Sequence, residues 1–164
     1  MPGWFDLFDW PIGIGVKNDE EGKKRAVESI KECVADLESR GIEKSRIVIG
    51  GFSQGGAVAL RAVYHDEDSS TNEGEDSFAA CVNLSGWLTF EKSNQVNDNV
   101  PLFWGHGSYD DKVLFEQQAY GVNKLMEMGV SNVEDSSYNI GHSSHPEEMK
   151  AFAKFLDEVL YSNK

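Results

Sequence analysis

The sequence predicts an α/β fold, a three-layer sandwich in which helices cover both faces of a mostly parallel β-sheet. Short apolar runs typical of buried strands alternate along the chain with longer segments of helical periodicity. Such alternation produces βαβ units, whose strands run parallel and whose helices lie on the faces of the sheet. With 164 residues, the chain is expected to form one domain over residues 1–164.

The first third of the chain predicts a loop, a helix and a strand. Residues 1–18 are aromatic and rich in Gly and Pro without any period, which predicts an apolar loop. Residues 19–40 carry one apolar stripe and acids in the first turn, and Gly41 follows as a helix C-terminal signal. The β-branched run 46–52 predicts a buried strand. Residues 54–64 then predict a helix with small residues suited to close packing.

The rest of the chain continues the alternation after an acidic segment. Residues 65–77 are polar and acidic without the spacing of a calcium-binding loop, so they predict a solvated surface loop. The later expected elements are strands at 78–84, 100–105 and 132–138, a helix over 114–128, and a last helix that begins at Pro146. In the helix over 114–128 the expected inward residues are Leu114, Ala119, Val122 and Leu125 or Met126.

Composition excludes several classes of partner. The net charge of −13 argues against nucleic acids and anionic membrane surfaces, which bind clustered Lys and Arg. No apolar run approaches the ~20 residues of a membrane-spanning helix, so no stable membrane insertion is expected. Cys33 and Cys81 lack any metal-binding spacing and are expected to be buried free thiols in a reducing compartment. Together these features predict a cytoplasmic protein.

The strongest motif is G-x-S-x-G at residues 51–55, between a predicted strand and a predicted helix. Glycines on either side let the chain turn sharply, so that Ser53 points off the sheet edge as a nucleophile. The backbone N–H of Gln54 would then lie at a helix N-terminus, where it can stabilise an oxyanion. A structural glycine turn produces the same pattern, so the motif alone leaves that alternative open.

Candidate partners for Ser53 follow two later strands. Asp110 and Asp111 follow the strand over 100–105, and His142 and His145 follow the strand over 132–138. The order Ser, acid, His is that of an α/β hydrolase triad, and all three loops open at the same edge of a parallel sheet. His142 follows a glycine at the mouth of the site, which suits a general base. His145 beside Pro146 is expected to cap the last helix. The remaining histidines are expected to be structural or solvated: His106 as a satisfied structural histidine and His65 in solvent.

Five segments of the chain carry a resemblance to a known family. "WFDL", "RIVIGGFSQGGAVAL", "LSGWL", "GHGSYDD" and "GHSSHPEEM" resemble, in this order, the acyl-protein thioesterase, lysophospholipase and carboxylesterase family of α/β hydrolases. The resemblance implies Ser53 as nucleophile, Asp110 as the acid of the His-Gly-x-x-Asp segment, and His142 as the base. It implies that the Gln54 N–H is one oxyanion donor, and that Asp111 stands where the family often has proline.

The family resemblance also implies a substrate class. Family members hydrolyse thioesters and esters of fatty acyl chains without a metal or organic cofactor, so the expected substrates are acylated proteins, small acyl esters or lysolipids. Trp87 and Leu88 would lie near the acyl pocket. With Trp4 and Phe5 they would form an apolar mouth for the chain.

One departure from the family pattern supports a second hypothesis. Family members begin with further strands and a Leu-His-Gly loop that supplies the second oxyanion donor, whereas this chain begins at "MPGWFDL". The expected fold is therefore an N-terminally truncated α/β hydrolase, in which the strand over 46–52 has one open side and self-association is expected. The alternative function is a catalytically impaired remnant that acts at most as a binding or interaction module. The oligomeric state stays open.

Overall fold

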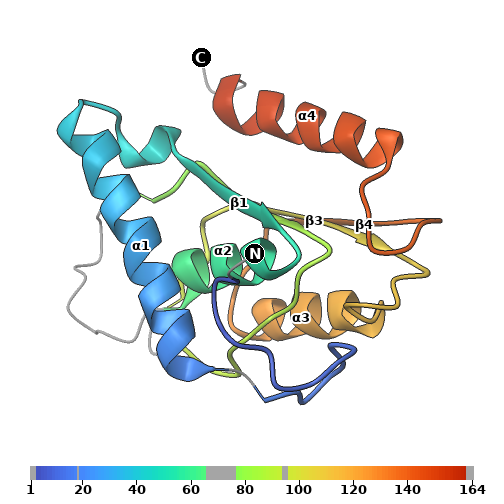
Figure 1. Ribbon diagram of the computed structural model, residues 1–164. Helices are drawn as coiled ribbons and strands as arrows, with labels where there is room; N and C mark the ends of the chain where they lie inside the picture. Colours follow the sequence, from blue (N-terminus) through green and yellow to red (C-terminus); the bar gives the residue numbers. More distant parts are fainter. Residues whose placement is uncertain (1–2, 18, 66–76, 94–95, 162–164) are drawn as a thin grey trace.

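The computed structural model describes residues 3–17, 19–65, 77–93 and 96–161. Its centre is a four-stranded parallel sheet in the order β1-β2-β3-β4 (Figure 1). The strands are β1 (Val48–Phe52), β2 (Ala80–Leu84), β3 (Leu102–Gly107) and β4 (Val133–Tyr138). Because all four run in the same direction, the loops that follow them open at one edge of the sheet.

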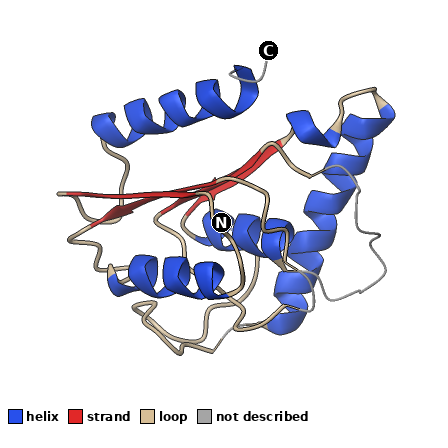
Figure 2. Cartoon of the chain, turned by 180° about the vertical axis from the view of Figure 1, so that it is seen from behind, coloured by secondary structure: helices blue, strands red, loops and turns tan. Residues whose placement is uncertain are grey.

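Helices cover both faces of this sheet. The helices are α1 (Glu20–Ser39), α2 (Gln54–Tyr64), α3 (Glu116–Glu127) and α4 (Pro146–Tyr161), with a short 3₁₀ turn at Lys44–Arg46. In both views α2 and α3 lie against one face, α1 packs beside α2, and α4 crosses the opposite face (Figures 1 and 2). This arrangement confirms the predicted three-layer α/β fold.

Side chains of the central strands alternate between the two faces. Cys81 and Trp104 belong to the core under α2 and α3, whereas Val82 and Phe103 belong to the core under α4. The Phe103 ring lies 5.5 Å from that of Phe155, which is 4% exposed. Burying a phenylalanine side chain of this kind is worth about 1.5–3 kcal/mol, so this contact holds α4 on the sheet.

The N-terminal loop is tied to two distant parts of the chain. Asp19 is the N-cap of α1, and its carboxylate accepts hydrogen bonds from the backbone N–H groups of Gly22 at 2.9 Å and Asp6 at 3.2 Å. These two hydrogen bonds lower the pKa of Asp19. Farther along the loop, Ile12 forms a parallel bridge with Val113, just before α3. The loop is therefore held against both α1 and the segment that follows β3.

The expectation of a buried strand at 46–52 is wrong in part, whereas the expectation that this strand has one open side agrees with the described residues. β1 is an outermost strand of the sheet, and within the described residues no strand pairs with its outer side. Its residues are consequently half-buried or exposed, and Phe52 is 42% exposed. The expected acidic loop over 65–77 falls mainly on residues 66–76, which lie outside the described residues.

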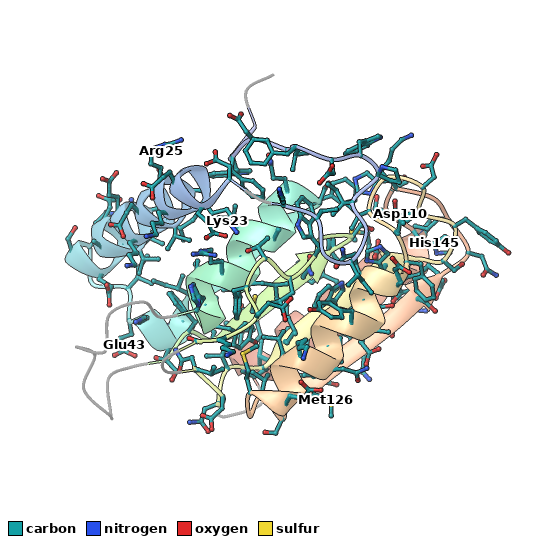
Figure 3. All side chains as sticks on the ribbon, turned by 90° about the horizontal axis from the view of Figure 1, so that it is seen from below. Lys23, Arg25, Glu43, Asp110, Met126 and His145 are labelled. Carbon is teal, nitrogen blue, oxygen red and sulfur yellow. The ribbon has the colours of Figure 1, made fainter. Side chains whose placement is uncertain are left out.

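The inward face of α3 also differs from the expectation. Val122 is buried as predicted, and of the alternatives Leu125 and Met126 it is Leu125 that is buried, whereas Met126 is 55% exposed on the outer side of the helix (Figure 3). Ala119 is exposed, contrary to the expectation. A Cβ on Gly121 would lie 2.3 Å from the Trp104 ring, so Trp104 packs directly against this glycine. The buried residues of α3 also include two polar ones that the apolar pattern did not predict, Gln117 and Gln118.

The two cysteines occupy different environments. Cys81 is buried in β2, as expected, whereas Cys33 is exposed. The expectation for Cys33 was wrong because this residue lies outside the apolar stripe of α1, whose buried members include Ala26, Val27 and Val34.

Candidate active site

Ser53 occupies a sharp turn between β1 and α2. Its backbone has φ 55° and ψ −121°, a strained conformation that a serine adopts only when its surroundings enforce it. A Cβ on Gly51 would lie 2.3 Å from the carbonyl carbon of Gly55, so only glycine fits there. The Ser53 N–H donates to the Leu84 carbonyl at 2.7 Å, which fastens the turn to β2.

A chain of two short hydrogen bonds joins Ser53, His142 and Asp110. The Nε2 atom of His142 lies 2.8 Å from Ser53 Oγ, and its Nδ1 atom lies 2.7 Å from Asp110 Oδ2. Because a carboxylate only accepts, Nδ1 carries the ring proton and Nε2 is free to accept the hydroxyl proton. The arrangement is able to deprotonate the serine hydroxyl and to stabilise the imidazolium that results.

The structure separates the two candidate acids. Asp110 is 5% exposed, and its Oδ1 atom accepts hydrogen bonds from the backbone N–H groups of Lys112 and Val113, both at 2.9 Å. Asp111 has an exposed side chain that pairs with the Lys112 ammonium group at 3.2 Å. Asp110 therefore faces His142, and Asp111 faces solvent.

The other three histidines do not contact Ser53. His106 is fully buried, with Nε2 at 2.9 Å from the Val113 carbonyl oxygen and 3.5 Å from Asp110 Oδ2, and burial lowers its pKa. The Nδ1 atom of His145 accepts the Glu147 N–H at 3.2 Å, so His145 caps α4 as predicted. It lies at the same end of the molecule as Asp110 (Figure 3). The expectation that His65 is solvated was wrong, because its ring stacks on Phe90 at 4.7 Å.

Gln54 combines the expected backbone position with a side-chain role that the sequence did not reveal. It is the first residue of α2, where backbone N–H groups lack intrahelical partners and favour negative charge. Its carboxamide accepts the Trp4 N–H and donates to the Phe5 carbonyl, both at 2.7 Å. Gln54 therefore fastens the N-terminal loop beside Ser53.

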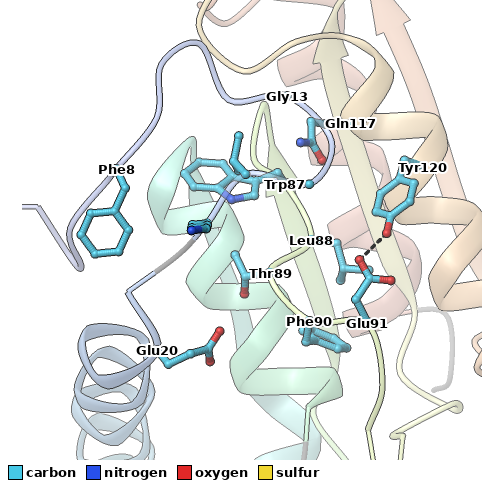
Figure 4. A pocket seen from close by; sticks show the side chains of 13 residues that line it. Phe8, Gly13, Glu20, Trp87, Leu88, Thr89, Phe90, Glu91, Gln117 and Tyr120 are labelled. Atoms are coloured by element: carbon cyan, nitrogen blue, oxygen red, sulfur yellow. Dashed lines mark hydrogen bonds between the residues drawn. The ribbon is translucent and has the colours of Figure 1, made fainter.

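The four expected substrate-binding residues divide into two groups. Trp4 is 47% exposed beside Gln54, whereas Phe5 is 6% exposed and packs edge-on against Trp87 at 5.9 Å. Trp87 and Leu88 are buried and line a pocket of about 520 Å³ between the N-terminal loop and α3 (Figure 4). The catalytic candidates themselves do not line this pocket.

The pocket begins next to the nucleophile even though Ser53 is not part of it. A Cβ on Gly86 would lie 2.8 Å from the Ser53 carbonyl oxygen, so the segment that enters the pocket at Trp87 starts against the backbone of Ser53. Near the triad the sequence analysis missed Phe52, whose ring lies 4.8 Å from that of His142. Phe52 occupies a variable position of the G-x-S-x-G motif, so the motif did not indicate this contact.

Within the described residues, the structure was also searched for a metal site and for a membrane-spanning helix. No group of three or more His, Cys, Asp or Glu side chains in the described ranges is placed to hold a metal ion. Similarly, none of the helices that the structure describes is both long and apolar enough to cross a membrane.

Comparison with known proteins shows the family to which a chain with this geometry belongs. Residues 1–160 match the model of the phospholipase/carboxylesterase family. The chain belongs to this family. Among its relatives, acyl-protein thioesterase 1 of Aspergillus fumigatus is 34% identical over 98% of this chain and 68% of the relative. A probable carboxylesterase of Oryza sativa subsp. japonica is 31% identical over 100% of this chain and 60% of the relative.

Solved structures of phospholipase/carboxylesterase-like proteins have the same fold. The crystal structure of Arabidopsis thaliana SOBER1 superposes with a TM-score of 0.83 at 28% identity, over 98% of this chain and 75% of that one. Zea mays acyl-protein thioesterase 2 gives a TM-score of 0.77 at 28% identity, over 96% of this chain and 72% of that one. These matches confirm the family resemblance and the α/β-hydrolase fold, and they support a hydrolase role.

Proposed function

We propose that this chain is a serine hydrolase that cleaves fatty acyl thioesters or esters with Ser53, His142 and Asp110. The observation that carries the proposal is the continuous hydrogen-bonded chain from Ser53 Oγ through His142 to Asp110, with Ser53 on a strained strand-to-helix turn. A glycine turn with only a structural role has no reason to align its serine with a histidine and a buried carboxylate.

The proposed reaction has two stages. Ser53 Oγ attacks the acyl carbon while its proton passes to His142 Nε2, and the Gln54 N–H binds the oxyanion that forms. The intermediate collapses to an acyl-Ser53 ester as His142 gives the proton to the departing thiol or alcohol. Water then repeats the sequence and releases a carboxylic acid. Asp110 holds the imidazole in the required tautomer throughout.

The proposed substrates are acylated proteins, small acyl esters or lysolipids, and the acyl chain would enter the pocket at Trp87 and Leu88. Apolar side chains at the start of this pocket favour a medium or long chain over an acetyl group. In a panel of nitrophenyl esters we therefore expect kcat/KM to rise from acetate to the medium-chain esters. A maximum at acetate would contradict this part of the proposal.

The direct test of the proposed nucleophile is labelling with a fluorophosphonate probe. The folded wild type should take one equivalent of label on Ser53, and Ser53→Ala should take none. Ser108→Ala is a matched control, because Ser108 also lies in a loop at this edge but bonds to the Tyr138 carbonyl and the Asn139 side chain. A folded wild type that takes no label would exclude the serine mechanism.

A second candidate function is a binding module with little turnover. It is favoured by the exposure of β1, the strand that carries Ser53, which within the described residues pairs with another strand on one side only. Fast labelling of Ser53 combined with negligible ester turnover would favour this candidate.

A further inference from the structure

His142 has a third contact besides its hydrogen bonds to Ser53 and Asp110. The centre of the Phe52 ring lies 4.8 Å from the centre of the imidazole, with 44° between the two ring planes. Both ring nitrogens of His142 are already engaged, Nε2 by Ser53 Oγ and Nδ1 by Asp110 Oδ2, and the side chain is only 17% exposed. Phe52 therefore contacts the imidazole ring itself and leaves both of its hydrogen bonds in place.

The alternation of β1 explains why Phe52 meets His142. Phe52 is the last residue of β1, and in a strand it shares a face of the sheet with Val48, four residues earlier. Val48 packs against the apolar cluster that lies under α4. The chain crosses to this same face between β4 and α4, and His142 lies in the crossing segment (Figure 1). The two rings are therefore brought together by the fold of the sheet.

The charge of His142 changes during the proposed reaction. The imidazole is neutral before it accepts the Ser53 proton and becomes an imidazolium once it has accepted it. A cation that is largely removed from water needs stabilising partners, and Asp110 supplies one of them at Nδ1. A cation within about 6 Å of the centre of an aromatic ring is attracted to the ring face, by an amount that corresponds to about two- to thirtyfold in an equilibrium constant. The Phe52 ring lies within that distance.

We propose that Phe52 is a positioning residue of the hydrolase reaction: its ring stabilises the imidazolium form of His142 over the neutral form and so favours proton transfer from Ser53. This inference rests on the proposed function, because it takes His142 to be the base that accepts the Ser53 proton. Phe52 acts through His142 and takes no part in making or breaking bonds. A side chain that only kept water away from His142 could be exchanged for any apolar group of similar size, whereas a ring that stabilises the imidazolium could not.

The first measurement varies the electrons of the Phe52 ring and keeps its shape. Phenylalanine analogues with one, two and three ring fluorine atoms, placed at this position, progressively weaken the negative potential of the ring face. Both kcat for nitrophenyl ester hydrolysis and the rate of fluorophosphonate labelling of Ser53 should fall with each fluorine, by at most about thirtyfold in all, with little change in KM. Phe52→Leu should also be slow, and Phe52→Tyr, which keeps the ring, should stay close to wild type. Rates that stay constant or rise along the fluorinated series would overturn the proposal.

Phe115 provides the matched control. Its side chain is 39% exposed, close to the 42% of Phe52, and its ring lies 6.1 Å from that of His106. Burial lowers the pKa of His106, so this second histidine is neutral at neutral pH and gives Phe115 no cation to stabilise. The same fluorinated series at Phe115 should therefore leave both rates within about twofold of wild type. An equal fall in the Phe115 series would contradict the assignment to Phe52.

A measurement without substrate separates this inference from the proposed function. The NMR signal of the His142 ring is followed against pH in wild type, in the trifluorinated Phe52 protein and in Phe52→Leu. Asp110 and His106, the titratable groups on the other side of this ring, are the same in all three proteins.

The protonation constant of His142 should be about two- to thirtyfold higher in wild type than in the other two proteins. The trifluorinated protein keeps the shape of the ring, so the comparison stands even if Phe52→Leu fails to fold. If Ser53 is labelled and esters are cleaved but His142 takes up its proton equally in all the folded proteins, the inference fails alone. If protonation of His142 depends on the Phe52 ring as expected but Ser53 takes no label, the proposed function fails, and the stabilising contact stands.

Discussion

Replacing Asp110 by asparagine tests the proposed catalytic geometry at its most constrained point. The Asp110 carboxylate accepts backbone N–H groups of Lys112 and Val113 on Oδ1 and the His142 Nδ1–H on Oδ2. In Asp110→Asn the side-chain oxygen must stay with the two backbone donors, so the amide NH₂ faces His142 Nδ1 across 2.7 Å. Two N–H donors cannot share this contact, and the ring proton must move to Nε2.

The expected magnitude follows from this change of tautomer. A proton on Nε2 faces Ser53 Oγ, so His142 no longer accepts the hydroxyl proton. The equivalent substitution in a serine protease lowers kcat by about 10⁴, which corresponds to about 5 kcal/mol of transition-state stabilisation. The fold should be almost unaffected, because asparagine keeps the shape of the side chain and the two bonds to the backbone.

The assay is the rate of nitrophenyl ester hydrolysis, together with the second-order rate of fluorophosphonate labelling and the melting temperature. Asp111→Asn is the control: its carboxylate is exposed and contacts only Lys112 among the described residues, so its rates should stay within about twofold of the wild type. Equal losses in the two variants, or a larger loss in Asp111→Asn, would refute the assignment of Asp110.

Three further outcomes are expected. His142→Ala should abolish turnover. His145→Ala should lose the helix cap, worth about 0.5–2 kcal/mol of stability, and the stacking on Tyr138, with turnover kept; inactive folded His145→Ala would contradict this. Burial raises the pKa of Glu148 above its ordinary value near 4.5, so the native state loses stability as pH rises above that value; Glu148→Gln should flatten the pH dependence of melting and Glu147→Gln should not. The open edge of β1 predicts that the 164-residue chain self-associates, so light scattering should give a mass above 18.2 kDa that rises with concentration; a constant 18.2 kDa would refute this.

Local sequence patterns were sufficient for most of the fold. The limits of α1 were predictable because Asp19 caps its start and Gly41, with φ +84°, follows its end. The strands β2 and β3 were predictable because both are buried on two faces and therefore form continuous apolar runs. Their parallel direction then required all later loops to open beside Ser53, and this placed the candidate triad residues together.

The exposure of β1 was not predictable from its own residues. The run Val48–Phe52 has the composition of a strand buried in the middle of a sheet, and composition reports the environment for which a strand is suited. Whether a strand lies in the middle or at an edge depends on which other strands pair with it. That is a property of the whole sheet, so the periodicity of one segment carries no information about it.

The buried face of α3 shows why the sequence did not predict all the residues that line the pocket. Hydrophobic periodicity favoured Ala119, which is exposed, whereas Gln117 and Gln118 are buried. Gln118 donates to the carbonyl groups of Trp104 and Ser136, at 2.9 and 3.0 Å, and so joins the helix to the sheet. Gln117, one residue earlier, lines the pocket instead. The same amino acid thus joins the helix to the sheet at one position and lines the pocket at the next, and hydrophobic periodicity does not distinguish the two positions.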